Sequence, residues 1–423
     1  MYKNYNKFLF ETFPSALIIL LPITLISGPF LSDLSVSLIA ISFIILIVKN
    51  KNYEVLNNKF VKLFLVFWIY ILINSLFFNF GFSSIKISFF YFRFLFFCLS
   101  VIFLLDKNPN LLQYLFYSFL FSFVILVADG YFQYFVGFNV LGYKLHEGPR
   151  VSSFFGEELI LGSYLSRLFP VFFGLTIYLY KNQKKKIFLT TILFILIECL
   201  VFLSGERVAF FYVNISAVFI IFFIKDYKVL RVLTLLFSFL LMFLITIYDD
   251  SAKKRILDIS LSQMGLTSSE DENVSKKKYL FSEEHHDQYL TAINMFKDKP
   301  ILGVGIKMFR ERCDDVEYSY GNYGCTTHPH NSYLQLLSET GFLGFSFLFY
   351  IFILFSIYIF KHFIGIFKKN FLFSDFEICL LSAIFITVWP IAPTGNFFNN
   401  WLTIIYYLPV GIFFWSRNKK LSN

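Results

Sequence analysis

Long apolar runs follow one another along almost the whole chain, and they restrict this sequence to one broad class of fold. Of its 423 residues, 57% are hydrophobic and 22% are aromatic, and the mean hydropathy is +0.65. A water-soluble protein of this size could not bury so much apolar surface, whereas a helix of about 20 apolar residues spans a bilayer. We therefore predict an all-α polytopic membrane protein.

Runs of roughly 17–25 apolar residues, the length that a membrane-spanning helix requires, occur about twelve times. They lie at 12–31, 34–48, 60–79, 85–105, 111–136, 159–180, 187–203, 208–224, 229–247, 341–360, 374–393 and 399–416. The first run has lysines before it and no small-residue cleavage pattern, so we expect an uncleaved anchor. The chain then divides into residues 1–247 with the first nine spans, a large polar loop at 248–340, and residues 341–423 with the last three.

The lysines gather in alternate connections and predict how the helices are oriented. One set of connections carries Lys49, Lys51, Lys59, Lys181, Lys184, Lys185, Lys186, Lys225, Lys228, Arg231, Lys361, Lys368, Lys369, Arg417, Lys419 and Lys420. The alternate short loops carry only Lys86, Lys144, Arg150 and Arg207. Because cations favour the cytoplasmic side, we expect both termini in the cytoplasm and the 248–340 loop outside. The net charge of +9 reflects this topology and does not indicate a nucleic-acid partner.

The cysteines fall into two groups. Cys98, Cys199 and Cys379 lie in apolar runs and are expected to be packing residues. Cys313 and Cys325 lie in the external loop, where an oxidising compartment permits a disulfide; the alternative is a pair of free thiols. These two cysteines and the histidines of the same loop could together be metal ligands. No closely spaced ligand pair of the zinc type recurs, however, so no metal site is predicted. Those histidines are His285, His286, His328 and His330.

The segment that closes the polar loop is the most informative one. The chain has six histidines, and two of them flank Pro329. Pro329 fits the first turn of a helix, and Leu334, Leu337, Gly341 and Gly344 then follow at helical spacing on one buried face. Asn331, Gln335 and Glu339 form a separate polar face. A histidine at a helix start is disfavoured as imidazolium and lies among N–H groups that suit a phosphate, which indicates a neutral base beside an anionic substrate.

Several motifs around this segment occur together. A Gly303-x-Gly305 turn and an arginine-bearing stretch precede the Cys313–Cys325 loop. His-Pro-His-Asn then begins at His328, and Glu-x-Gly-x-x-Gly ends at Gly344 as an apolar run starts. Together they resemble the superfamily of O-antigen ligases and Wzy-type polymerases, which are membrane glycosyltransferases of the C-type superfold. Residues 150–156 and 204–207 resemble it more weakly. In the second of these segments, Glu206 interrupts the Ser-Arg pair common in that family.

The resemblance implies a metal-independent, inverting enzyme without a cofactor in a bacterial inner membrane. It implies that a glycan moves from undecaprenyl pyrophosphate to an acceptor hydroxyl on the periplasmic side. A ligase uses lipid A–core as its acceptor, and the close alternative, a polymerase, extends a growing glycan. A transporter of lipid-linked sugars is a further alternative, but it would predict paired half-repeats, and the sequence shows none. A scaffold would leave the outer arginines unexplained.

Roles follow for individual residues. Guanidinium groups bind phosphate oxygens in a fork, so Arg150, Arg207 and Arg310 are the expected pyrophosphate ligands. His330 is the expected catalytic base; His328 could replace it, and a capping or packing role for His330 is the alternative. His328 and Asn331 are also expected near the substrate. Glu339 is assigned to catalysis by orienting the helix or the acceptor, and its alternative is a solvated face. Gly341 and Gly344 are expected to allow close packing.

Four charged residues lie within apolar runs, where an unpaired charge is costly. They are Arg93, Asp129, Arg167 and Glu198. We hypothesise that they pair around a cavity open to the outer leaflet; unrelated structural ion pairs are the alternative.

Overall fold

The computed structural model describes residues 6–78, 81–254, 258–263, 279 and 282–421. In this part of the chain the structure is helical and has no β-strand. The main helices are α2 (Phe13–Ile26), α3 (Pro29–Asn50), α4 (Lys59–Ile73), α5 (Phe82–Phe90), α6 (Arg93–Lys107), α7 (Leu111–Val136), α8 (Leu161–Tyr180), α9 (Lys184–Leu203), α10 (Arg207–Phe223), α11 (Lys228–Tyr248), α14 (Glu283–Asp298), α16 (Ser332–Phe367), α17 (Asp375–Val388) and α18 (Asn400–Leu421). Three short helices complete the set: α12 (Asp250–Lys253), α13 (Ile259–Gln263) and α15 (Phe309–Arg312).

Eight helices among the described residues are long and apolar enough to cross a membrane. They confirm an α-helical polytopic membrane protein. The remaining four predicted runs coincide with α8, α10, α17 and α18; α10 and α17 have only 17 and 14 residues. A count of twelve spans therefore stays a prediction, as does the assignment of 248–340 to one external loop.

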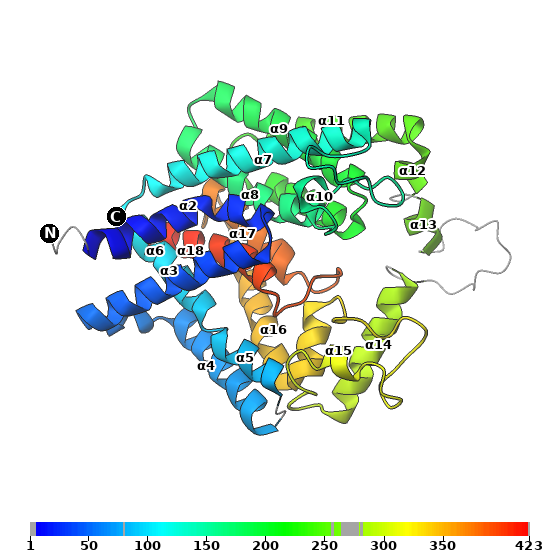
Figure 1. The fold of residues 1–423 in the computed structure, drawn as a ribbon. Helices are drawn as coiled ribbons and strands as arrows, with labels where there is room; N and C mark the ends of the chain where they lie inside the picture. The colour runs from blue at the N-terminus through cyan, green and yellow to red at the C-terminus, as the bar shows by residue number, and fades with distance from the viewer. Residues whose placement is uncertain (1–5, 79–80, 255–257, 264–278, 280–281, 422–423) are drawn as a thin grey trace.

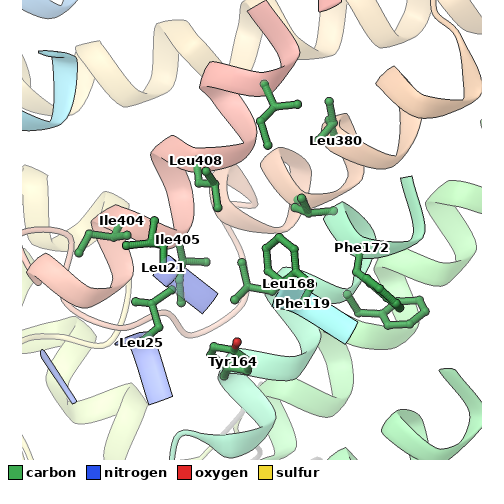
Figure 2. Close-up of a cluster of buried hydrophobic side chains, with 14 of the residues drawn as sticks. Leu21, Leu25, Phe119, Tyr164, Leu168, Phe172, Leu380, Ile404, Ile405 and Leu408 are labelled. Carbon is green, nitrogen blue, oxygen red and sulfur yellow. The ribbon is translucent and has the colours of Figure 1, made fainter. Parts of the chain in front are cut away.

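The helix α8 lies at the centre of the bundle. Almost every side chain from Leu161 to Ile177 is buried, because α17, α9 and α10 pack around it. Figure 2 shows a layer of this core, in which side chains from α2, α7, α8, α17 and α18 converge. The labelled residues are Leu21, Leu25, Phe119, Tyr164, Leu168, Phe172, Leu380, Ile404, Ile405 and Leu408. Many phenylalanines pack between helices in the same way.

The helix α16 connects the polar region to the bundle, and it is broken at Gly341. There φ is +64°, and the Phe342 N–H donates to the carbonyl of Pro300 instead of continuing the helix. The backbones of Gly303 and of the Glu339–Thr340 peptide lie so close that a Cβ at Gly303 would overlap them. The prediction of one uninterrupted helical face from Leu334 to Gly344 is therefore wrong at Gly341. The predicted Gly303-x-Gly305 turn occupies the break and bonds to its carbonyls.

Figure 1 shows α14 and α15 beside α16 at one side of the bundle, and α18 ends on the side at which α2 begins. Helix α14 packs against α16, as does α15. This arrangement places the polar region directly over the start of α16, where the histidine motif lies.

Candidate functional site

The histidine motif forms a turn in front of α16. The helix begins at Ser332, and the side chain of Asn331 accepts hydrogen bonds from the N–H groups of Tyr333 (2.9 Å) and Leu334 (3.1 Å). The prediction that Pro329 occupies the first helical turn is therefore wrong. Asparagine is a strongly preferred N-cap because it supplies the acceptor that those N–H groups lack. His330 precedes the cap and has φ of +47°.

The turn is held in place by the loop between α17 and α18. The Thr394 N–H donates to the His330 carbonyl at 2.7 Å, and the Ser332 N–H donates to the Thr394 hydroxyl at 2.8 Å. The Asn331 amide donates to the carbonyl of Pro390 at 2.8 Å. Asn331 therefore caps the helix and anchors the turn at the same time. Nothing in the motif itself indicated Thr394, which lies 64 residues beyond His330.

Three imidazole rings form a cluster at this turn. The ring centroids of His328 and His330 are 4.1 Å apart, and the ring of His285, from the first turns of α14, lies 5.5 Å from His330. Nδ1 of His285 is within 2.6 Å of the Ser282 hydroxyl, which fixes the orientation of the ring. His285 is a member of the site that the sequence did not single out, although it was considered as a metal ligand.

Burial keeps these imidazoles neutral. It lowers the pKa of His328 to about 3, assisted by the electrostatic interactions that a protonated His328 would have with His330 and Arg310. It lowers the pKa of His285 to about 4, assisted by His330 and Arg207, and it also lowers the pKa of His330. From the sequence, the helix dipole was the expected reason for a neutral base. The structure instead attributes the neutral form first to removal from water.

Two of the predicted arginines flank the histidine cluster. Arg207 is the first residue of α10, and its positive charge contributes to the lowered pKa of His285. Arg310, in α15, interacts electrostatically with His328 and donates a hydrogen bond to the carbonyl of Thr327 at 3.4 Å. Lys307 lies near Arg310, and its pKa is lowered by burial and then by that arginine. Cations from two separate elements thus border the same imidazoles.

The third predicted arginine, Arg150, contacts the Ser204–Arg207 turn. Its Nε donates to the carbonyl of Ser204 at 3.2 Å, and its charge acts on Glu206. The Glu206 carboxylate accepts the N–H groups of Gly162 (2.6 Å) and Ser163 (3.0 Å) at the start of α8. Removal from water raises the pKa of Glu206 to about 7 in spite of these partners. The residue that interrupts the Ser-Arg pair therefore caps a neighbouring helix.

Glu339 is fully buried, so its alternative role on a solvated face is wrong. One carboxylate oxygen accepts the Gln335 amide at 3.0 Å, and the other accepts the Phe309 N–H at 3.4 Å. Gln335 also donates to Asn396 and accepts the Phe397 N–H at 2.7 Å. The polar face predicted from four-residue spacing therefore joins α15 and the 390–399 loop to the same helix. Gly344 lies one turn further on, where a Cβ would meet the Thr340 side chain.

Cys313 and Cys325 form a disulfide. It closes the loop around a polar cavity of about 480 Å³, whose wall includes Arg310, Asn322 and Thr327. Cys98, Cys199 and Cys379 are free and buried. Among the described residues, no three His, Cys, Asp or Glu side chains are arranged to hold a metal ion.

The four charges within the apolar runs do not pair with one another, so that part of the hypothesis is wrong. Arg93 pairs with Asp33 at 2.7 Å. Asp129 accepts the Ser153 hydroxyl at 2.6 Å, and Arg167 donates to the Ser163 hydroxyl at 2.6 Å. Glu198 lies near Arg231. Arg231 is a buried residue of α11, so its assignment to a connection between helices is wrong. Arg93, Asp129 and Arg167 each have a polar partner nearby, which reduces the cost of their burial.

Fold and site together define a polytopic helical membrane protein in which neutral imidazoles and cations meet over the start of a membrane helix. Residues 189–349 match the family model described as O-antigen ligase. The matched segment runs from α9 into α16 and contains Arg207, Arg310 and His330, and it supports the O-antigen ligase superfamily that the sequence predicted. The family implies a glycosyltransferase-like enzyme whose partners are a lipid-linked glycan and an acceptor. No curated protein matches the chain.

Proposed function

We propose that the protein is an O-antigen ligase that transfers a glycan from undecaprenyl pyrophosphate to a hydroxyl of lipid A–core. The reaction would take place on the periplasmic side of a bacterial inner membrane, with both termini in the cytoplasm. The observation that carries the proposal is the neutral His330 imidazole, which lies beside His285 and His328 with Arg207 and Arg310 at the border of the cluster. The lysine distribution and the disulfide support the orientation.

In this proposal His330 accepts the proton of the acceptor hydroxyl as that oxygen attacks the anomeric carbon. The new carbon–oxygen bond forms while the bond to the pyrophosphate oxygen breaks, so the electron pair leaves with undecaprenyl pyrophosphate. A single displacement inverts the anomeric configuration. General base assistance is typically worth about 10²–10⁴-fold in rate. No step requires a metal or a cofactor.

Arg207 and Arg310 are the groups proposed to hold the leaving pyrophosphate. Guanidinium forks bind phosphate oxygens bidentately and stabilise the charge that develops as the bond breaks. Arg150, which donates to the carbonyl of Ser204 in the Ser204–Arg207 turn, is proposed as a third ligand. His328 and Asn331 are proposed to bind substrate beside the base, and Glu339 to keep the start of α16 in position for catalysis.

The same chemistry would serve a polymerase, since only the acceptor differs. Purified protein is therefore given synthetic undecaprenyl-pyrophosphate glycan together with lipid A–core and an unextended glycan acceptor, with and without EDTA. We expect lipid A–core conjugate in both conditions. Lengthened glycan without conjugate would identify a polymerase, and loss of product with EDTA would contradict the metal-independent mechanism.

The base is tested by His330→Ala, with His286→Ala as the matched control. His286 is on the same helix as His285, but its side chain is exposed and points at Tyr279 and Tyr320. We expect a loss of about 10²–10⁴-fold in kcat for His330→Ala and near-normal turnover for His286→Ala, with equal thermal stability. Full activity of His330→Ala would refute the assignment.

A further inference from the structure

A second cavity, larger than the one beside the disulfide, lies far from the histidine cluster. Its volume is about 610 Å³, within the range of about 300–1,000 Å³ that is typical of small-molecule sites. The last turn of α8, the turn before α11, the segment that leads into α17 and the last turns of α18 form its wall. Helix α8 starts beside Glu206 and ends at this cavity, and its 20 residues span about 30 Å. The cavity and the histidine cluster are therefore separated by about the thickness of a bilayer core.

One side of the cavity is cationic. Lys181, Lys225 and Lys419 contribute to its wall. The ammonium groups of Lys225 and Lys419 each lie 5.3 Å from the centroid of an aromatic ring, those of Phe371 and Trp415. These lysines belong to the lysine-rich connections that the charge pattern places at the cytoplasmic face.

Two aspartates also line the cavity, and both have partners of their own. Asp226 pairs with Lys181 at 2.6 Å. The carboxylate of Asp375 accepts the backbone N–H groups of Lys225 (2.8 Å) and Asp226 (2.9 Å), which fixes the turn that carries Lys225. Among the residues of the wall, three lysines outnumber two aspartates, which leaves a positive charge at the rim. Asp106, outside the wall, interacts electrostatically with Lys419 and offsets part of that charge.

The other side of the cavity is aromatic and apolar. Phe373, Phe376 and Trp415 are buried in its wall, whereas Tyr178 remains 41% exposed at the bundle surface. The Tyr178 ring packs against those of Phe376 (4.7 Å) and Trp415 (6.2 Å). A cationic rim beside an aromatic wall at the end of membrane helices is complementary to an amphiphile with an anionic headgroup. A soluble anion would use only the cationic part.

We propose that this cavity binds the headgroup of an anionic phospholipid, with the phosphate at Lys225 and Lys419 and an acyl chain along Tyr178. Basic pockets between membrane helices on the cytoplasmic side recognise such headgroups. The site is independent of the proposed transfer reaction, because it uses none of the residues of the histidine cluster and lies at the other end of α8.

The test measures lipid binding to the delipidated full-length protein in detergent by native mass spectrometry. The probes are phosphatidylglycerol, phosphatidylcholine of the same chain length and glycerol 3-phosphate. Lys225→Gln with Lys419→Gln removes two cations from the rim, and Lys361→Gln with Lys368→Gln removes two from the same face outside the cavity. We expect the wild type to prefer phosphatidylglycerol. Its affinity should fall about thirtyfold in the rim variant, at about fivefold per lysine, and should be unchanged in the control.

Three outcomes would overturn the proposal. Equal losses in both double variants would mean that the lipid responds only to the overall charge of the face. Equal binding of phosphatidylcholine would mean that apolar contact alone is recognised. Displacement of phosphatidylglycerol by glycerol 3-phosphate at similar affinity would identify a site for a soluble phosphate. None of these outcomes depends on whether the protein transfers a glycan.

Discussion

The buried histidines predict that the folded protein loses stability as the pH falls below about 6.5. The ordinary pKa of histidine is 6.5, and burial lowers that of His328 to about 3 and that of His285 to about 4. Between these values and 6.5 the unfolded chain binds protons that the folded chain does not. The free energy of unfolding must therefore rise with pH across this window and fall with acidification.

The size of the effect follows from the same values. On going from pH 6.5 to pH 5, an unfolded histidine changes from about half protonated to almost fully protonated, while His328 and His285 stay largely neutral in the fold. Each of them then reduces the free energy of unfolding by about 1.6 kcal/mol, and the two together by about 3 kcal/mol. His330 adds to this in the same direction, because burial lowers its pKa as well.

The measurement is reversible unfolding in mixed micelles, followed by tryptophan fluorescence at several pH values between 5 and 7. Carboxylates also titrate near this range, so the informative quantity is the difference between wild type and His328→Gln. Between pH 6.5 and pH 5, the free energy of unfolding should fall by about 1.6 kcal/mol less in His328→Gln than in the wild type. His286→Gln, which changes an exposed histidine on α14, should keep the wild-type slope. An identical pH slope in wild type and His328→Gln would refute the argument that burial keeps this imidazole neutral.

Three further substitutions or treatments test how the site is held together, each read as a change in the unfolding midpoint. Gln335→Leu removes three buried hydrogen bonds and leaves the Phe397 N–H without its acceptor, so we expect the free energy of unfolding to fall by about 3–5 kcal/mol. In the control Ser338→Ala, which removes one hydrogen bond within the helix, it should fall by less than about 1 kcal/mol. Gly303→Ala introduces a Cβ at φ +69° against the Glu339–Thr340 peptide and should cost at least about 2 kcal/mol, more than Gly344→Ala, whose Cβ meets only a side chain. The Cys313–Cys325 disulfide joins cysteines 12 residues apart in the sequence, and its reduction should lower the free energy of unfolding by about 3 kcal/mol. An unchanged unfolding midpoint after reduction would contradict a structural role.

The class of fold could be predicted from the sequence because hydrophobic runs act locally and additively. Helix ends depend instead on competition between local signals, as the start of α16 shows. Pro329 and Asn331 each favour a helix start. The helix begins after Asn331 because the side chain of Asn331 accepts hydrogen bonds from two backbone N–H groups of the first turn. The break at Gly341 could not be seen in the spacing of apolar residues, since it is stabilised by the backbone of residues 300–303, about 40 residues earlier.

Members of the site that are distant in sequence were found only where a motif already marked them. Arg207 and Arg310 were expected because guanidinium groups suit pyrophosphate, and the structure brings both to the histidines. His285 and Thr394 carry no motif, and their place depends on how α14 and the 390–399 loop pack on α16. Arg231 was assigned to a loop because charge patterns alone do not show where a helix begins. It lies in α11 beside Glu198.

The geometry around His330 shows how the proposed base is kept both neutral and fixed in position. Its ring is shielded by two other imidazoles, which removes it from water without placing a carboxylate partner beside it. Its backbone is held by Thr394, and the helix behind it is tied through Gln335 and Glu339 to two separate segments. A carboxylate next to the ring would favour the protonated form and remove the base, whereas distant polar bonds fix the position without that effect. Orientation and protonation are therefore controlled by different residues, and a substitution at Gln335 should reduce turnover without moving the pH at which His330 titrates.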